Sequence, residues 1–214
     1  MKVLRTVVVL GLCVLVGSAV AQEQKKQQGA AARVAPKLKK GDALGAFYVT
    51  KCAGAESDQV PVGENLCYRC KNGARPQVIV FTRSTDPIVI RLAKRLDAAV
   101  NQHEDQQLRA FISVLGESKE QAEAEAKKLA AQAGVEQIPF VVPNDVQQGP
   151  ENYGLNPKAA ITIVIGNENQ VVATYAVANP ADLKIARVNK LIEQTLSPQD
   201  ATAAPAKKAK PQDS

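Results

Sequence analysis

Two cysteines separated by two residues, in Cys67-Tyr68-Arg69-Cys70, are the strongest candidates for chemistry in this sequence. A pair at this spacing can exchange disulfides with a substrate, because one thiolate attacks and the other resolves the mixed disulfide. The neighbouring cations of Arg69 and Lys71 would favour the thiolate form of either cysteine. We therefore take Cys67 and Cys70 as the candidate catalytic residues.

The same pair could instead form a structural disulfide, as is common in exported proteins. Residues three apart in an extended strand are separated by about 10 Å, whereas a disulfide needs Cα atoms closer than about 7 Å. Either the segment is turned, or Cys67 or Cys70 bonds Cys52. The sequence favours the structural role, because a helix N-terminus is the usual setting of an activated cysteine, but it leaves the catalytic role open.

Metal and haem sites have too few ligands in this chain. A closed zinc site needs a full tetrahedral ligand set, and the expected mature chain offers only three cysteines and His103. The polar stretch NQHEDQQ around His103 predicts a solvated loop residue. Lys71 stands where covalent haem attachment requires a histidine. We expect no metal and no other cofactor, with copper capture by Cys67, Cys70 and His103 as the minor alternative.

The segments after the cysteines predict a strand that leads directly into a helix. Residues 78–81 form a short, continuous apolar run, which predicts a central strand buried on both faces. Asp86 then offers an N-cap and Pro87 a first helical residue, and apolar side chains follow at helical spacing. Between the cysteines and this strand, Asn72-Gly73 is a strong turn signal.

The remaining elements follow from similar signals. We expect strands at residues 43–50, 108–115, 138–142, 161–165 and 171–177, the last two as an antiparallel hairpin. We expect helices at Lys119–Ala133, between Ser118 and Gly134, and after Asn179-Pro180. The proline in 138–142 indicates an edge strand or the start of a strand. Residues 51–64, which include Cys52, are expected to form a loop.

Taken in order, these segments resemble the thioredoxin fold, and in particular its peroxiredoxin and redoxin branch. The resemblance rests on the segments QVIVF, RAFISVLGES, IPFVVPND and ITIVIGNENQVVA. It implies an α/β protein, a three-layer thioredoxin-like sandwich in which a mixed central sheet is flanked by helices. In redox-active members the reactive cysteine follows the first core strand, at a helix N-terminus. That position here, residues 82–87, reads TRSTDP, so the family's peroxidatic chemistry cannot be transferred to it.

The two ends of the chain have compositions that do not suit a packed core. Residues 1–21 combine Lys2 and Arg5 with an apolar run and Ala19-Val20-Ala21, which predicts a cleaved signal peptide. The compositions of residues 22–40 and 197–214 predict a disordered Lys/Gln-rich linker and a disordered Ala/Pro/Lys tail. We expect residues 41–196 to form one thioredoxin-like domain of an exported protein, periplasmic or secreted, without a stable membrane span after signal cleavage.

The net charge of +6 arises from the two ends of the chain and not from the expected domain. We therefore expect no nucleic-acid partner, since a basic folded face and stacking aromatic residues are both missing. The leading hypothesis is a thioredoxin-like protein of the cell envelope with a thiol-disulfide redox role toward a protein thiol or disulfide. The alternative is a non-catalytic thioredoxin-fold binding or scaffold module with a structural disulfide.

Overall fold

The computed structural model describes residues 34–197, so the predictions for residues 1–21 and for most of both expected tails lie outside the described residues. Its strands are β1 (Val49–Ala53), β2 (Asn65–Leu66), β3 (Gln77–Thr82), β4 (Arg109–Val114), β5 (Phe140–Pro143), β6 (Ile161–Asn167) and β7 (Gln170–Val177). They form one sheet in the order β2-β1-β5-β4-β3-β6-β7. β3, β4 and β5 run parallel, and the other pairings are antiparallel.

β3 lies inside the sheet between β4 and β6, and all of its residues are buried. This confirms the buried strand that the continuous apolar run predicts. β5 also lies inside the sheet, with Pro139 just before its first residue. The proline therefore marks a strand start and not an edge, because it removes a donor only where pairing has not yet begun.

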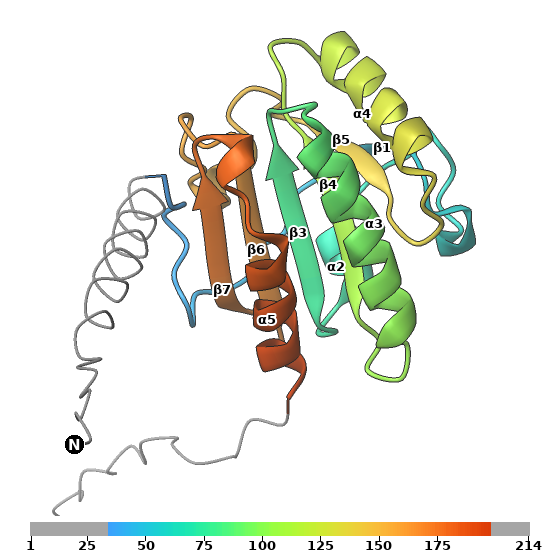
Figure 1. Ribbon diagram of the computed structural model, residues 1–214. Coiled ribbons are helices and arrows are strands. Elements are labelled where there is room, and N and C mark those ends of the chain that lie inside the picture. Colours follow the sequence, from blue (N-terminus) through green and yellow to red (C-terminus); the bar gives the residue numbers. More distant parts are fainter. Residues whose placement is uncertain (1–33, 198–214) are drawn as a thin grey trace, which may run out of the picture.

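Three long helices cover one face of the sheet: α3 (Pro87–Gln102), α4 (Lys119–Ala133) and α5 (Ile185–Leu196) (Figure 1). Their apolar sides pack against strand residues such as Val80 and Ile163. Local hydrogen bonds explain where the first two begin. The Asp86 side chain accepts from the Ile88 amide, and the Ser118 side chain accepts from the Gln121 amide.

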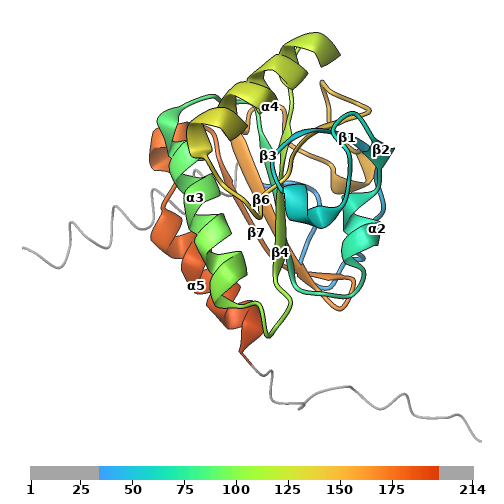
Figure 2. The same cartoon turned by 90° about the vertical axis from the view of Figure 1, so that its right-hand side faces the viewer.

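The opposite face of the sheet is covered by the short helix α2 (Tyr68–Asn72), the N-terminal segment and the turn around η2 (Glu151–Tyr153) (Figure 2). Aromatic rings fill this second core. Phe47 lies 4.9 Å from Tyr153 and 5.6 Å from Phe81, measured between ring centroids, and Tyr68 lies 5.7 Å from Phe111. A mixed sheet covered on both faces confirms the predicted three-layer α/β architecture.

Part of the segment that the sequence assigns to a linker packs against the domain. Val34 and Leu38 are buried, and the Lys37 amide donates to the Gly154 carbonyl at 3.0 Å. Leu38 contributes to the aromatic core described above. The packed unit therefore includes residues upstream of position 41.

Three local expectations differ from the structure. The opening strand is Val49–Ala53 and not 43–50, so Cys52 lies in a strand and not in a loop. Gly73, with a φ of 62°, ends helix α2, so Asn72-Gly73 is a helix terminus and not a separate turn. Asn179 caps the 3₁₀ helix η3 (Pro180–Asp182), and α5 begins only after Lys184.

Candidate functional site

Cys67 and Cys70 form a disulfide at the start of α2, with their Cα atoms 5.1 Å apart. Cys67 is the N-cap residue of this helix, and the helical turn that follows brings Cys70 back toward it. An extended chain could not do so. Of the two arrangements that the sequence leaves open, the turned segment is the one observed.

Cys52 is a free, buried thiol on the other face of the sheet. It belongs to the core beneath the three long helices, whereas Tyr68 of α2 belongs to the core on the opposite face. The sheet therefore separates Cys52 from the disulfide. Burial, followed by the nearby carboxylate of Glu123, raises the pKa of the Cys52 thiol to about 11. Such a thiol stays protonated near neutral pH and is a poor nucleophile.

The two cysteines of the disulfide differ in exposure. Cys67 is 8% exposed and therefore buried, whereas Cys70 is exposed. The sulfur of Cys67 also accepts a hydrogen bond from the Cys70 amide at 3.1 Å. Cys70 is thus the more accessible of the two residues, and the sulfur of Cys67 has an N–H donor beside it that would stabilise a thiolate.

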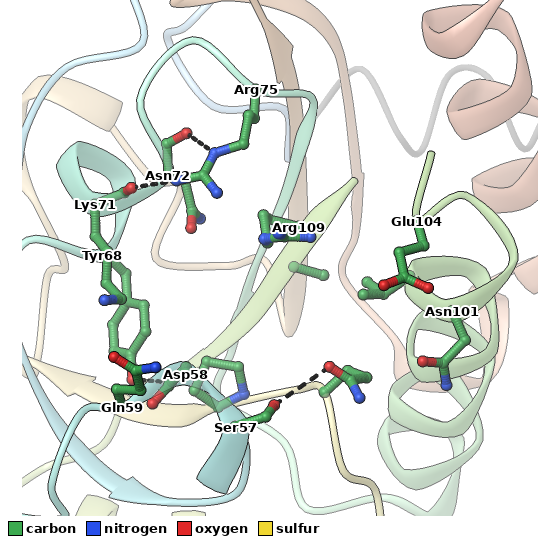
Figure 3. Close-up of a pocket in the computed structure, with 14 residues that line it drawn as sticks. Ser57, Asp58, Gln59, Tyr68, Lys71, Asn72, Arg75, Asn101, Glu104 and Arg109 are labelled. Carbon is green, nitrogen blue, oxygen red and sulfur yellow. Dashed lines mark hydrogen bonds between the residues drawn. The ribbon is translucent and has the colours of Figure 1, made fainter. Parts of the chain in front are cut away.

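A buried polar network holds α2 against the sheet. Lys51 points from β1 to the α2 side and is 2% exposed, yet its ammonium donates to Asp58 Oδ1 and to the carbonyls of Ala55 and Val60 at 2.8–2.9 Å. Asp58 Oδ2 accepts from the Tyr68 hydroxyl at 2.5 Å (Figure 3). Burial, with the Asp58 hydrogen bond, raises the pKa of Tyr68 well above its usual range. The residue that follows Cys67 is therefore fixed through Asp58 to β1.

Sequence reasoning missed Lys51 and Asp58 as parts of this site. Nothing in their local sequence marks them, because residues 51–64 have the composition of a loop. The one available signal is Lys51 itself, once the strand Val49–Ala53 is known. A lysine in a strand that faces a core needs partners for its charge. Its partners lie several residues further along the chain, and only the fold brings them to it.

Comparison with known proteins gives the fold its name. No family model and no curated protein matches the sequence. Solved structures do match. A Chlorobium tepidum protein assigned as thiol:disulfide interchange protein DsbE aligns at a TM-score of 0.54 and 16% identity, over 75% of this chain and 99% of that one. The chain has the thioredoxin fold.

Two Mycobacterium tuberculosis structures are similar to the same degree. AhpC aligns at a TM-score of 0.54 and 15% identity, over 75% of this chain and 99% of that one. The peroxidoxin BcpB aligns at a TM-score of 0.53 and 14% identity, over 74% of this chain and 96% of that one. These neighbours agree with the redoxin-like resemblance read from the sequence. At such identities they establish the fold alone, so the role of the disulfide must be argued from its geometry.

The disulfide does not lie at residues 82–87, the position that holds the reactive cysteine in redox-active proteins of the redoxin type. The disulfide precedes β3 on the α2 side of the sheet, whereas residues 82–87 run from the last residue of β3 to the first residue of α3. There the Thr82 hydroxyl accepts from the Ser84 amide at 3.0 Å, and the Asp86 carboxylate caps α3. Arg83 donates to the Gln147 carbonyl at 2.8 Å. These side chains fix the loop and supply no thiol.

His103 is not the solvated loop residue that its neighbours in sequence predict. It ends α3, its side chain is 13% exposed, and its Nε2 lies 3.1 Å from Glu193 Oε1 in α5. Among residues 34–197, no group of three or more His, Cys, Asp or Glu side chains could hold a metal ion. In the same range, no helix is long and apolar enough to cross a membrane.

Proposed function

We propose that this chain is an exported thioredoxin-fold protein whose Cys67–Cys70 disulfide exchanges electrons with protein dithiols. The observation that carries the proposal is the asymmetry of the pair, an exposed Cys70 bonded to a buried Cys67 whose sulfur already accepts an N–H bond. A structural neighbour assigned as a thiol:disulfide interchange protein supports this class of reaction. Export rests on the composition of residues 1–21.

In the first step, a substrate thiolate attacks the sulfur of Cys70. The Cys67–Cys70 bond breaks, its electron pair passes to the sulfur of Cys67, and a mixed disulfide joins the substrate to Cys70. The leaving thiolate is stabilised by the Cys70 amide, which lies 3.1 Å away in the oxidised protein. A stabilised leaving group speeds this exchange.

In the second step, another thiolate of the substrate attacks the substrate's own sulfur in the mixed disulfide. Cys70 leaves as a thiolate, the substrate is oxidised to a disulfide, and the protein is reduced to a dithiol that takes up the two protons. The reverse sequence lets the reduced protein reduce a substrate disulfide, with Cys70 attacking and Cys67 resolving. The difference in exposure between Cys70 and Cys67 supports these roles in either direction of exchange.

A second function is favoured by the packing of α2. Tyr68 is buried and anchored to Asp58, and residues 82–87 contain no thiol. In a segment that is fixed in this way, the disulfide could have a purely structural role and hold the shape of a surface that binds a partner protein. In this binding or scaffold module the thioredoxin fold would persist without redox chemistry.

The reduction potential of the mature protein separates the two functions. Oxidised protein is equilibrated in glutathione buffers, and the Cys67 and Cys70 thiols are counted by alkylation and mass spectrometry. We expect a potential between about −120 and −270 mV, the range of known oxidoreductases. A potential below about −300 mV would assign the disulfide a structural role.

Single cysteine variants test the proposed roles. Cys67→Ser should accumulate mixed disulfides with substrate proteins through Cys70, because nothing resolves them, whereas Cys70→Ser should not. Cys52→Ser is the matched control and should behave like the natural protein, since Cys52 lies across the sheet. Accumulation through Cys67 instead would reverse the assignment. The export part is tested separately, by a mature N-terminus at or near Gln22 in the envelope or medium fraction.

A further inference from the structure

A cavity of about 530 Å³ is lined by α2, by the C-terminal part of α3 and by the start of β4, at the edge of the sheet where β5 does not pair with β4. None of the cysteines described by the structure lines it (Figure 3). Tyr68, Lys71 and Asn72 line it from α2, and Asn101 lines it from α3. Its volume falls within the roughly 300–1,000 Å³ typical of small-molecule sites. The redox proposal does not use this cavity.

Three cationic residues line this cavity: Lys71, Arg75 and Arg109. Arg75 is held in place by hydrogen bonds from Nε to the Asn72 carbonyl at 2.7 Å and from a terminal nitrogen to the Lys71 carbonyl at 2.6 Å. Arg109 donates to the Leu108 carbonyl at 2.9 Å. A guanidinium has more N–H groups than these bonds use, so both arginines keep donors for a ligand.

The positive charge of the cavity is only partly balanced by the residues that line it. Burial lowers the pKa of the half-buried Arg109, and the neighbouring charge of Arg75 lowers it further. The Asp58 carboxylate on the cavity wall already pairs with Lys51 at 2.8 Å. The remaining carboxylate, Glu104, is exposed, and its charge offsets part of the lowering of the Arg109 pKa. The three cations outnumber this one free carboxylate, and an anion beside Arg75 and Arg109 would relieve the repulsion between their charges.

We propose that this cavity binds a small ligand through an anionic group, a carboxylate or a phosphate, held by Arg75 and Arg109 with Lys71 at the rim. Forked N–H donors match the paired oxygens of either group. Val100, Ala110 and Pro139 add apolar side chains to the lining, so there is also room for a short carbon chain. The site is separate from the disulfide, and its existence does not depend on the redox role.

The test is an NMR titration of the oxidised protein with inorganic phosphate and, separately, with butyrate, each at constant ionic strength set by chloride. At least one probe should give saturable shifts centred on the amides of residues 68–75 and 101–110, with a dissociation constant of about 1 mM or tighter. Tighter binding of phosphate indicates a phosphate ester as the natural ligand, and tighter binding of butyrate indicates a carboxylate. Shifts scattered over the surface, or no saturation with either probe, would overturn the proposal.

Variants localise the binding. Arg75→Gln and Arg109→Gln should each weaken it by about tenfold or more, because each removes a charge-assisted contact. Arg83→Gln is the matched control, since Arg83 is also a half-buried arginine but lines a different cavity. Equal weakening by Arg83→Gln would mean unspecific charge attraction and reject the site. If either cavity variant fails to fold, Lys71→Gln replaces it, because this side chain is exposed, and an unchanged affinity there would also count against the site.

Discussion

The Tyr68 hydroxyl donates a 2.5 Å hydrogen bond to Asp58 Oδ2, so the residue beside Cys67 is tied to the loop that precedes β2. The other oxygen of Asp58 accepts from the Lys51 ammonium and from the Val60 amide, each at 2.8 Å. The position of the disulfide is therefore set by groups outside the cysteine segment. The anchoring of α2 can be tested without touching either cysteine.

Tyr68→Phe should lower the free energy of unfolding by about 1–3 kcal/mol, because it removes a hydrogen bond to a charged acceptor and keeps the ring that packs on Phe111. Urea unfolding of the oxidised protein measures the change. Tyr48→Phe is the matched control, since Tyr48 is 58% exposed and should change stability by less than about 0.5 kcal/mol. Equal effects of the two substitutions would mean that the Asp58 contact contributes nothing.

Lys51→Met should destabilise the protein by about 3–5 kcal/mol, because it leaves the Asp58 carboxylate without its cation and unpairs two buried carbonyls. The double variant Lys51→Met with Asp58→Leu should recover part of that loss, since it also removes the unpaired charge. Thermal and urea unfolding of the single and double variants give the comparison. A single variant as stable as the natural protein would show that the buried ammonium can be replaced by packing alone.

The elements that could be predicted are those whose cause is local in sequence. The Asp86 and Ser118 caps each bond an amide two or three residues away, and β3 is an unbroken apolar run. The sequence predicts the opening strand several residues too early, because Lys51 and Cys52 do not continue a pattern of alternating apolar residues. Lys51 can be buried only because Asp58 and two carbonyls reach it in the folded chain.

In the candidate site, too, only the features with a local cause could be predicted from the sequence. The spacing of Cys67 and Cys70 correctly implied a turned segment if the two were bonded to each other. The sequence could not show that Cys52 is not a disulfide partner of Cys67 or Cys70, because this depends on which face of the sheet each residue occupies. The contact between His103 and Glu193 joins elements at distant positions in the sequence, so composition alone described His103 wrongly.

Cys52 should make stability fall at alkaline pH. The folded protein holds the proton of this buried thiol up to a pKa of about 11, whereas the ordinary value is 9.0. The unfolded chain therefore loses the proton first, and the contribution to stability is complete below about pH 9 and is lost as the pH rises through about 11.

Urea unfolding at about pH 8 and about pH 10 should show a steeper loss for the natural protein than for Cys52→Ala, by about 1 kcal/mol over that interval. The variant keeps Tyr68 and Tyr153, whose pKa values burial also raises, so their shared contribution cancels in the comparison. Parallel pH profiles for the two proteins would contradict the assignment to Cys52.

Val80→Asp should abolish folding or cost more than about 3 kcal/mol, because Val80 is fully buried in β3 between Ile112 and Ile163 and the carboxylate would have no partner. Val62→Asp is the matched control, since Val62 is 62% exposed, and it should stay within about 0.5 kcal/mol of the natural protein. Circular dichroism and solubility report the result. A soluble, cooperatively folding Val80→Asp protein would place β3 outside the core.

Reduction of the Cys67–Cys70 disulfide should lower the free energy of unfolding by clearly less than the roughly 3 kcal/mol expected for a fifteen-residue loop, because the ring that it closes is very short. The anchoring of Tyr68 to Asp58 does not involve the disulfide and should persist after reduction. The measurement compares urea unfolding of the oxidised and reduced proteins in the Cys52→Ser background, so that no third thiol can exchange.

This stability difference and the reduction potential are linked by a thermodynamic cycle, since the disulfide favours folding by as much as folding favours the disulfide. About 30 mV in the potential corresponds to about 1.4 kcal/mol. A small loss of stability therefore means that folding hardly lowers the potential of the pair, so that the disulfide stays easy to reduce. A loss above about 4 kcal/mol would mean that folding lowers the potential by more than about 80 mV, which moves the pair toward the range of structural disulfides below about −300 mV.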